Sequence, residues 1–311
     1  MKRESKEGEG MSLLMNWLES LSYEIKAGDR CLRKFSPFST CTVCSDSCDV
    51  QVFSYENGIP IIDTQNCDHC GRCITVCPVQ AIEGQSPSRN IVNNILILED
   101  TPLPTINELL RFHVHDIQTI SINNHNERRE NTVEETNALL ILMNKSPFKI
   151  IRSEECITVQ PTKLSRRNFF NKLSWEGKKL AATTITPVKW RFNHGKFKMT
   201  DLYPYWAFFS IELNQEQCTL CSACFRLCPE KVFSIVDGLL KVNTGNCTGC
   251  SLCVDVCQDK GISIKQDVCQ SNIKSWPIKE GICKTCGDSF LSWNEDETCY
   301  ICKSRKANNY L

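Results

Sequence analysis

Cysteine is the residue type whose spacing could do chemistry in this chain, which has 22 cysteines among 311 residues. Eight of them form two runs of the pattern Cys-x2-Cys-x2-Cys-x3-Cys, one from Cys218 to Cys228 and one from Cys247 to Cys257. Thiolates two residues apart reach neighbouring irons of one iron–sulfur cube, and the fourth cysteine of each run ligates the other cube. The pattern therefore predicts two [4Fe–4S] clusters rather than disulfides.

A second copy of this pattern occurs 180 residues earlier, since Cys41 corresponds to Cys221 and Cys77 to Cys257. The segments between the cysteines also correspond, and each copy is expected to contain a β-hairpin. The hairpins should turn at Asn57-Gly58 and at Asp237-Gly238, because these residue pairs tolerate positive φ. The chain is therefore expected to contain two modules, each built for two clusters.

The earlier copy lacks one cysteine, because Phe38 stands where the later copy has Cys218. No comparable strand is expected before Cys41, where the chain reads Phe35-Ser36-Pro37-Phe38. Three outcomes remain open. Cys31 could bend in as the fourth ligand, the site could hold a three-iron or labile-iron cluster, or it could be empty.

The crossover rule assigns the cysteines to four expected sites. Site A takes Cys41, Cys44 and Cys77, with Cys31 as the candidate fourth ligand, and site B takes Cys48, Cys67, Cys70 and Cys73. In the later module, site C takes Cys218, Cys221, Cys224 and Cys257, and site D takes Cys228, Cys247, Cys250 and Cys253.

Two further pairs, Cys283-x2-Cys286 and Cys299-x2-Cys302, follow the second module. Two such knuckles make a tetrahedral sulfur site of the zinc-ribbon kind, for which zinc is the favoured ion and a single iron the rival. Asp288 and the run Glu295-Asp296-Glu297 lie around these cysteines. We expect this acidic loop to repel phosphates, which argues against nucleic acid as a partner.

Lys plus Arg and Asp plus Glu number 36 each, so net charge gives no indication of nucleic acid or an anionic membrane as partner. The apolar run over 202–213 is too short to span a bilayer. The first ten residues are charged and do not form a secretory signal, and clustered thiols suit a reducing compartment. A cytoplasmic protein without a transmembrane segment is expected.

The sequence divides into six expected regions. Residues 1–30 are expected to form a tail with a short helix around 13–21. The two cysteine-rich modules are expected over 31–84 and 206–268. Between the modules, the pattern of residues 91–160 predicts three strands, over 94–98, 118–122 and 148–151. It also predicts two helices, over 105–114 and 132–144. Strands that alternate with helices in this way are expected to form a small parallel sheet. A basic linker over 161–205 contains the twin-arginine-like sequence Ser165–Phe170, and the zinc-ribbon-like unit covers 279–305.

The motif from Cys67 to Pro78 and the one from Cys218 to Cys257 resemble bacterial-type 4Fe-4S dicluster ferredoxin domains. Asp49 and Gln258 depart from the proline that usually follows the fourth cysteine. The resemblance implies an α+β protein, with two ferredoxin-like modules flanking an α/β segment, that is similar to accessory electron carriers of molybdopterin oxidoreductases. The expected function is an electron carrier rather than an enzyme. The alternative is a maturation or interaction factor whose clusters are structural.

Overall fold

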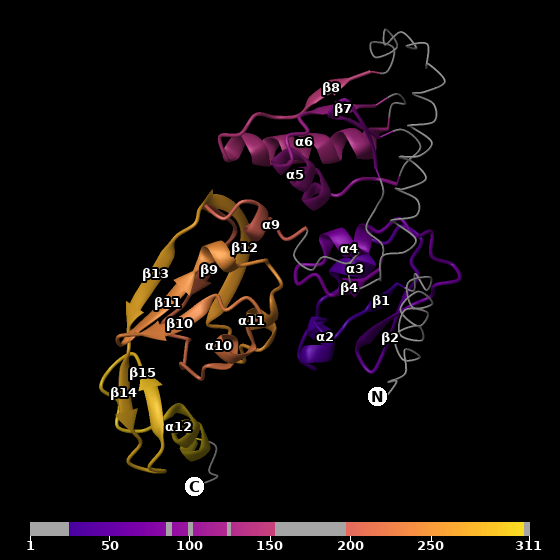
Figure 1. The fold of residues 1–311 in the computed structure, drawn as a ribbon. Coiled ribbons are helices and arrows are strands. Elements are labelled where there is room, and N and C mark those ends of the chain that lie inside the picture. The colour runs from indigo at the N-terminus through magenta and orange to yellow at the C-terminus, as the bar shows by residue number, and fades with distance from the viewer. Residues whose placement is uncertain (1–24, 85–88, 99–101, 123–125, 153–196, 308–311) are drawn as a thin grey trace, which may run out of the picture.

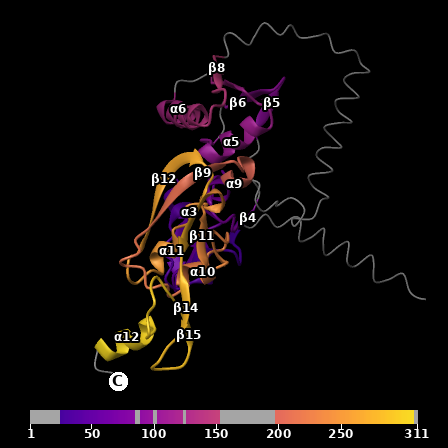
Figure 2. The same ribbon diagram turned by 90° about the vertical axis from the view of Figure 1, so that its left-hand side faces the viewer.

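The computed structural model describes residues 25–84, 89–98, 102–122, 126–152 and 197–307. Viewed from two sides, this part of the chain is elongated, with the α/β segment at one end and the C-terminal hairpin with α12 at the other (Figures 1 and 2). The two cysteine-rich modules lie between these ends. The helix expected around 13–21 and the sequence Ser165–Phe170 lie outside the described residues.

The first module combines a short two-stranded sheet, a hairpin and three short helices. Its elements are β1 (Lys26–Ala27), α2 (Leu32–Phe35), α3 (Val43–Asp46), β2 (Phe53–Glu56), β3 (Ile59–Ile62), α4 (Arg72–Val76) and β4 (Ile82–Glu83). Strand β1 pairs antiparallel with β4, and β2 pairs antiparallel with β3. The hairpin turns at Asn57 and Gly58, with φ of 51° and 79°, which confirms the predicted turn.

The second module repeats this plan with longer strands. Its elements are β9 (Trp206–Leu213), α10 (Ala223–Leu227), β10 (Phe233–Val236), β11 (Leu239–Asn243), η2 (Thr244–Asn246), α11 (Leu252–Asp255), β12 (Ile262–Gln270) and β13 (Ile273–Pro277). Strands β9 and β12 pair antiparallel, and β13 adds a third strand to the hairpin of β10 and β11. Asp237 and Gly238 turn that hairpin with φ of 54° and 68°.

The expectation that no strand precedes the first run of the earlier module was wrong. The amide of Gly28, directly after β1, donates to Ala81 O at 2.7 Å, as Asn214 after β9 donates to Gly261 O at 2.9 Å. Ala81 and Gly261 are 180 residues apart, whereas Gly28 and Asn214 are 186 apart. The entry strand therefore exists but lies six residues farther upstream, within the range expected to be a tail.

The α/β segment contains the five predicted elements and one more strand. They are β5 (Asn90–Val92), β6 (Ile95–Ile97), α5 (Ile106–Val114), β7 (Thr119–Ser121), α6 (Glu127–Leu142) and β8 (Lys149–Ile151). Strands β6, β7 and β8 are parallel, and the unpredicted β5 adds an antiparallel edge. Helix α6 begins five residues before the predicted start because the Asn126 side chain caps it, accepting from Arg129 N at 3.1 Å.

The α/β segment packs against both modules. Its core includes Leu110 and Ile120 and is continuous with Tyr203 and Phe208 at the entrance to the second module. Toward the first module, Thr105 Oγ1 donates to Thr75 Oγ1 of α4 at 2.8 Å. The segment therefore fixes α4, the helix that carries Cys73. Within the described residues, no helix combines the length and apolar character needed to cross a membrane.

Candidate metal centres

Three of the four cysteine runs share one backbone conformation. The residues on either side of the second cysteine both have positive φ, in the pairs His69 and Gly71, Leu220 and Ser222, and Gly249 and Ser251. A short helix starts directly after each pair and carries the third cysteine of the run. Two left-handed residues in three reverse the chain sharply, so the first three thiols of each run are presented from one tight turn.

The run at Cys41 departs from this conformation. Thr42 has φ of −127°, and Thr40 is not among the residues with positive φ. Phe38, which replaces the first cysteine of this run, leaves 62 % of its surface exposed. The missing cysteine is therefore accompanied by a different chain path, and Phe38 lies on the surface.

The turns at the fourth cysteines are alike in all four runs. The third residue after each of these cysteines has φ of 51° or 52°, namely Gln51, Gln80, Lys231 and Lys260. In three runs, the amide four residues after the cysteine donates to its Sγ, at 3.1 Å for Cys77, 3.5 Å for Cys228 and 3.3 Å for Cys257. Such N–H donors favour a thiolate. The turns at Gln51 and Lys260 form although Asp49 and Gln258 replace the usual proline.

Cys31 lies with the other cysteines of site A. Burial raises the pKa of Cys44 to about 12, and charge interactions with Cys77, Cys41 and Cys31 add to this rise. The Cys31 amide donates to Gly28 O at 3.1 Å, which corresponds to Cys218 N–H donating to Asn214 O at 2.9 Å. Cys31 thus follows its entry strand as Cys218 follows β9.

The cysteines expected at sites B, C and D also lie close enough to affect one another's pKa. For Cys73 of site B, burial raises the thiol pKa, as do charges at Cys70, Cys67 and Cys48. In site C, burial raises the pKa of Cys224 to about 12, with added effects from the other three members, Cys218, Cys221 and Cys257. The pKa of Cys253 in site D is raised by burial and by Cys250, Cys247 and Cys228.

Charge interactions between cysteines also link neighbouring sites. Cys44 of site A interacts with Cys73 of site B, and Cys224 of site C with Cys253 of site D. Between the modules, Cys41 of site A interacts with Cys250 of site D. Cysteines of sites A and D also pack against one core cluster that both modules share, so these two sites lie nearest the module boundary.

The chemistry of these donor sets fits iron–sulfur clusters. Buried thiols with a raised pKa keep their protons at neutral pH, and four adjacent thiolates would repel one another without a cation. Bound iron would supply that positive charge and would displace the protons. Each set offers the four thiols that one [4Fe–4S] cluster requires.

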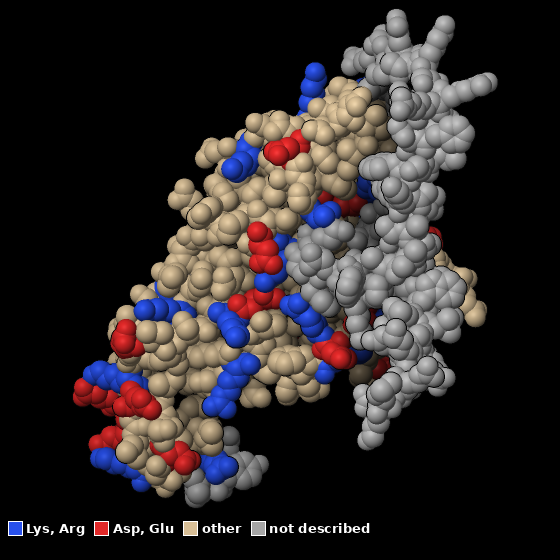
Figure 3. Space-filling model, viewed as in Figure 1, with Lys and Arg blue, Asp and Glu red and all other residues tan. Residues whose placement is uncertain are grey.

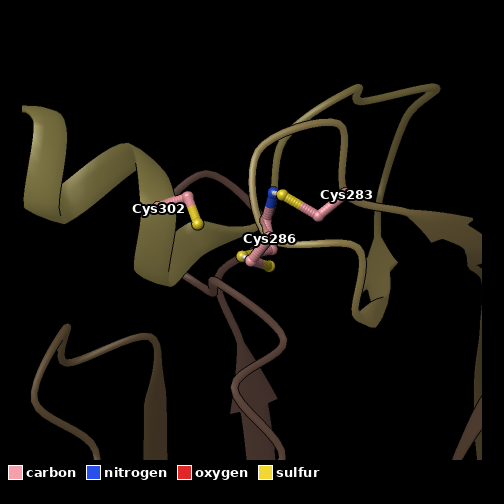
Figure 4. A group of neighbouring side chains, drawn as sticks. Cys283, Cys286 and Cys302 are labelled. Atoms are coloured by element: carbon pink, nitrogen blue, oxygen red, sulfur yellow. Dashed lines mark hydrogen bonds between the residues drawn. The ribbon is translucent and has the colours of Figure 1, made fainter. Parts of the chain in front are cut away.

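The four C-terminal cysteines form a compact group. Their sulfur atoms all lie within 4.8 Å of one another, and Cys283, Cys299 and Cys302 are buried. Cys283 precedes the turn between β14 (Lys279–Ile282) and β15 (Ser289–Ser292), while Cys302 lies on α12 (Tyr300–Ala307). Figure 4 shows Cys283, Cys286 and Cys302 converging from these elements. The Cys299 amide donates a hydrogen bond to the sulfur of Cys283 at 3.2 Å. This hydrogen bond is the main reason that the pKa of Cys283 is lowered to about 6.

The acidic loop around this group is largely paired with lysines. Glu295 pairs with Lys279, Glu297 with Lys284 at 2.5 Å, and Asp296 with Lys303 at 2.6 Å. On the face drawn in Figure 3, acidic and basic side chains of the described residues are interspersed. The pairs weaken the phosphate repulsion that the sequence suggests.

Two hydrogen bonds join this C-terminal unit to the second module beside site C. Trp293 Nε1 donates to the carbonyl of Cys218 at 2.6 Å. Asp259 accepts from Thr219 Oγ1 at 2.9 Å and from Tyr300 Oη at 3.2 Å. The C-terminal unit therefore lies against the backbone of a cysteine of site C.

Sequence reasoning missed the residues that join the two modules. Thr40 and Asp255 hydrogen-bond across the module boundary, and Arg30 pairs with Glu230. These residues carry no local motif. The one available signal is their position, since each lies within two residues of a predicted cysteine ligand.

Comparisons with known proteins match the second module and part of the first. A family model described as a 4Fe-4S dicluster domain matches residues 210–258, and one described as a 4Fe-4S binding domain matches residues 59–82. An uncharacterized ferredoxin from Methanocaldococcus jannaschii is 41 % identical over 39 residues, which are 12 % of this chain and 26 % of that ferredoxin. The chain thus spans about a quarter of that relative's length. These matches show that parts of both modules are similar to 4Fe-4S ferredoxin domains.

Proposed function

We propose that this protein relays single electrons through four [4Fe–4S] clusters, held at sites A to D, to or from a redox enzyme. The observation that carries the proposal is the gathering of sixteen cysteines into four sets of four, with each set linked to its neighbour. A bound cluster supplies reversible storage of one electron. The chain supplies thiol ligands, burial and N–H donors to sulfur.

Cys31 is the proposed fourth ligand of site A. Its support is the equivalence with Cys218 after the entry strand and the charge interaction with Cys44. Of the three outcomes that the sequence leaves open, this arrangement favours a complete four-thiol site. The proposed cluster count is therefore four rather than three.

The C-terminal group is proposed to hold a structural zinc ion through Cys283, Cys286, Cys299 and Cys302. Four thiols within 4.8 Å suit a closed tetrahedral site, and zinc has no redox chemistry of its own. A single iron is the rival ion for the same four ligands. Metal analysis of the purified protein distinguishes them, because iron would add a rubredoxin-like visible absorption.

The electron donor or acceptor is proposed to be a redox enzyme, with a molybdopterin oxidoreductase as the specific candidate. This candidate rests on the resemblance of the two-module order to accessory electron carriers of such enzymes. Purification of the protein with its partner under anaerobic conditions, followed by molybdenum analysis of the complex, tests it. A partner without molybdenum would overturn that assignment and leave the carrier role intact.

The central test is anaerobic purification followed by metal analysis and a redox titration. About sixteen irons and one zinc per chain are expected if all four cubes assemble. Electron paramagnetic resonance (EPR) should show clusters that accept and release one electron each. Clusters that resist reduction at every accessible potential would contradict the carrier function and favour the structural role of a maturation factor.

A further inference from the structure

The segment from Arg30 to Cys41, which includes Cys31 and is here called the entry excursion, contacts the second module at both of its ends. It takes nine residues to connect the two cysteines, where Cys218 and Cys221 are separated by two. Helix α2 lies within it, and Leu32 of that helix is 2 % exposed. The excursion is thus an ordered part of the fold.

At the C-terminal end of the entry excursion, Thr40 binds Asp255. The Thr40 amide donates to one carboxylate oxygen of Asp255 at 2.9 Å, and Thr40 Oγ1 donates to the other at 2.8 Å. Thr40 directly precedes Cys41 of site A, and Asp255 is two residues after Cys253 of site D. A bidentate contact therefore joins the backbone beside a ligand of each site.

At the N-terminal end, Arg30 pairs with Glu230 at 3.6 Å. The Glu230 side chain is 8 % exposed, and its other carboxylate oxygen accepts from Lys198 at 2.5 Å. Arg30 directly precedes Cys31 of site A, and Glu230 is two residues after Cys228 of site D. A second, longer contact, an ion pair without a hydrogen bond, therefore joins residues beside a ligand of each site.

The surface between these two contacts is apolar and shared by the modules. Leu252 and Val256 of the second module are buried in one core cluster with Leu32 and Ile74 of the first. Cys31, Cys41 and Cys44 of site A pack against this same cluster, as does Cys250 of site D. Cysteines of both sites therefore contact one shared apolar core.

The excursion is itself held in place by Arg33. Its guanidinium donates from Nη2 to Thr40 O at 3.0 Å and from Nε to Cys41 O at 2.5 Å. It also lies 4.6 Å from the centroid of the Tyr55 ring. Arg33 therefore fixes the backbone that presents Thr40 to Asp255.

We propose that the entry excursion is the coupling element between the modules, and that Thr40–Asp255 and Arg30–Glu230 are the positioning pairs that hold site A against site D. This inference rests on the proposed electron-carrier function. Electrons cross between the modules from A to D or from D to A. In that crossing, one electron leaves the donor site and is accepted at the other, and no bond is formed or broken.

The test uses the full-length protein, purified anaerobically and fully reduced, with magnetic coupling between clusters measured by EPR. Asp255→Asn and Glu230→Gln, combined, remove both carboxylates at nearly constant volume. The expected result is loss of the coupling between A and D, while coupling within each module and the iron content remain. Glu212→Gln, which removes a surface partner of Lys265, is the matched control and should leave all couplings unchanged.

A second pair of variants approaches the same contacts from the first module. Thr40→Val and Arg30→Gln, combined, should give the same loss and keep the proposal testable if the first pair does not fold. Inter-module coupling that persists in a variant with full iron content would overturn the proposal, and so would its absence from the wild-type protein. Clusters that cannot be reduced at all would instead overturn the carrier function, and this inference with it.

Discussion

The two modules differ most where the chain enters the cysteine cluster. In the second module, β9 runs for eight residues and reaches Cys218 five residues after its last residue, Leu213. In the first module, β1 has two residues and Cys31 follows four residues after Ala27. In both, the last strand residue pairs with the residue five after the fourth cysteine, as Leu213 with Ile262 and Ala27 with Ile82.

Pairing with the sheet, rather than position in the sequence repeat, defines the equivalent cysteine. Aligned by sequence, Phe38 corresponds to Cys218, but its side chain is exposed. Aligned by strand register, Cys31 corresponds to Cys218. The added residues lie between an entry strand that both modules share and a run at Cys41 whose turn differs from that at Cys221.

The largest effect is expected from removing the two equivalent thiols. Cys31→Ser and Cys218→Ser should each lower the iron content by the same amount, from about sixteen to about twelve, because each leaves a site with three thiols. Retention as a three-iron cluster would give about fifteen irons and its characteristic EPR signal. Unchanged iron in Cys31→Ser, alongside loss in Cys218→Ser, would show that the two thiols are not equivalent.

The next test asks whether a cysteine at position 38 can replace Cys31 as a ligand of site A. Adding Phe38→Cys to Cys31→Ser should not recover the lost iron, since Phe38 is 62 % exposed and its run lacks the left-handed turn. Iron analysis of the double variant checks this. Recovery of full iron content would mean that the chain at Cys41 can adopt the conformation seen at Cys221.

A smaller effect is expected at the left-handed positions. A Cβ atom on Gly249 would lie 2.2 Å from Cζ of Phe209, so Gly249→Ala should destabilise the protein by about 1–3 kcal/mol. Gly71→Ser is the control, because Ser251 occupies the equivalent place with φ of 58°. It should cost about 1 kcal/mol or less. Thermal unfolding of the loaded protein measures both, and equal losses would contradict the role of Phe209.

The smallest effect concerns the residue after the fourth cysteine. Asp49 of the first module pairs with Arg128 at 2.9 Å and Arg72 at 2.5 Å, whereas the second module has Pro229. Asp49→Asn should cost about 0.5 kcal/mol in the free energy of unfolding, because the carboxylate is half exposed and its pairs are screened. The difference should shrink as salt is added. A loss that is large and independent of salt would show that Asp49 has another role.

Local chemistry made much of this structure predictable from the sequence. The Asn57-Gly58 turn follows from the preference of these residues for positive φ, and the ligand sets follow from the reach of a two-residue spacing. The entry strand β1 escaped prediction because two residues are too few to show an alternating pattern. The start of α6 was missed because its first turns are polar and do not show the apolar periodicity.

The contacts between modules could not be predicted, since they depend on residues far apart in the chain. Thr40 and Asp255 are 215 positions apart, and neither belongs to a recognisable motif. The same holds for Arg30 and Glu230. Such pairs are set by how two folded units meet, which the spacing of cysteines within each unit does not encode.

The length of the entry excursion has a consequence for the assembly of site A. Closing a loop of ten residues instead of three costs about 1 kcal/mol more in chain entropy, since each doubling of length costs about 0.6 kcal/mol. Burial of Leu32, which contributes about 2 kcal/mol, offsets this cost only after α2 has packed. Site A should therefore be completed later than site C during folding, once the excursion has been anchored.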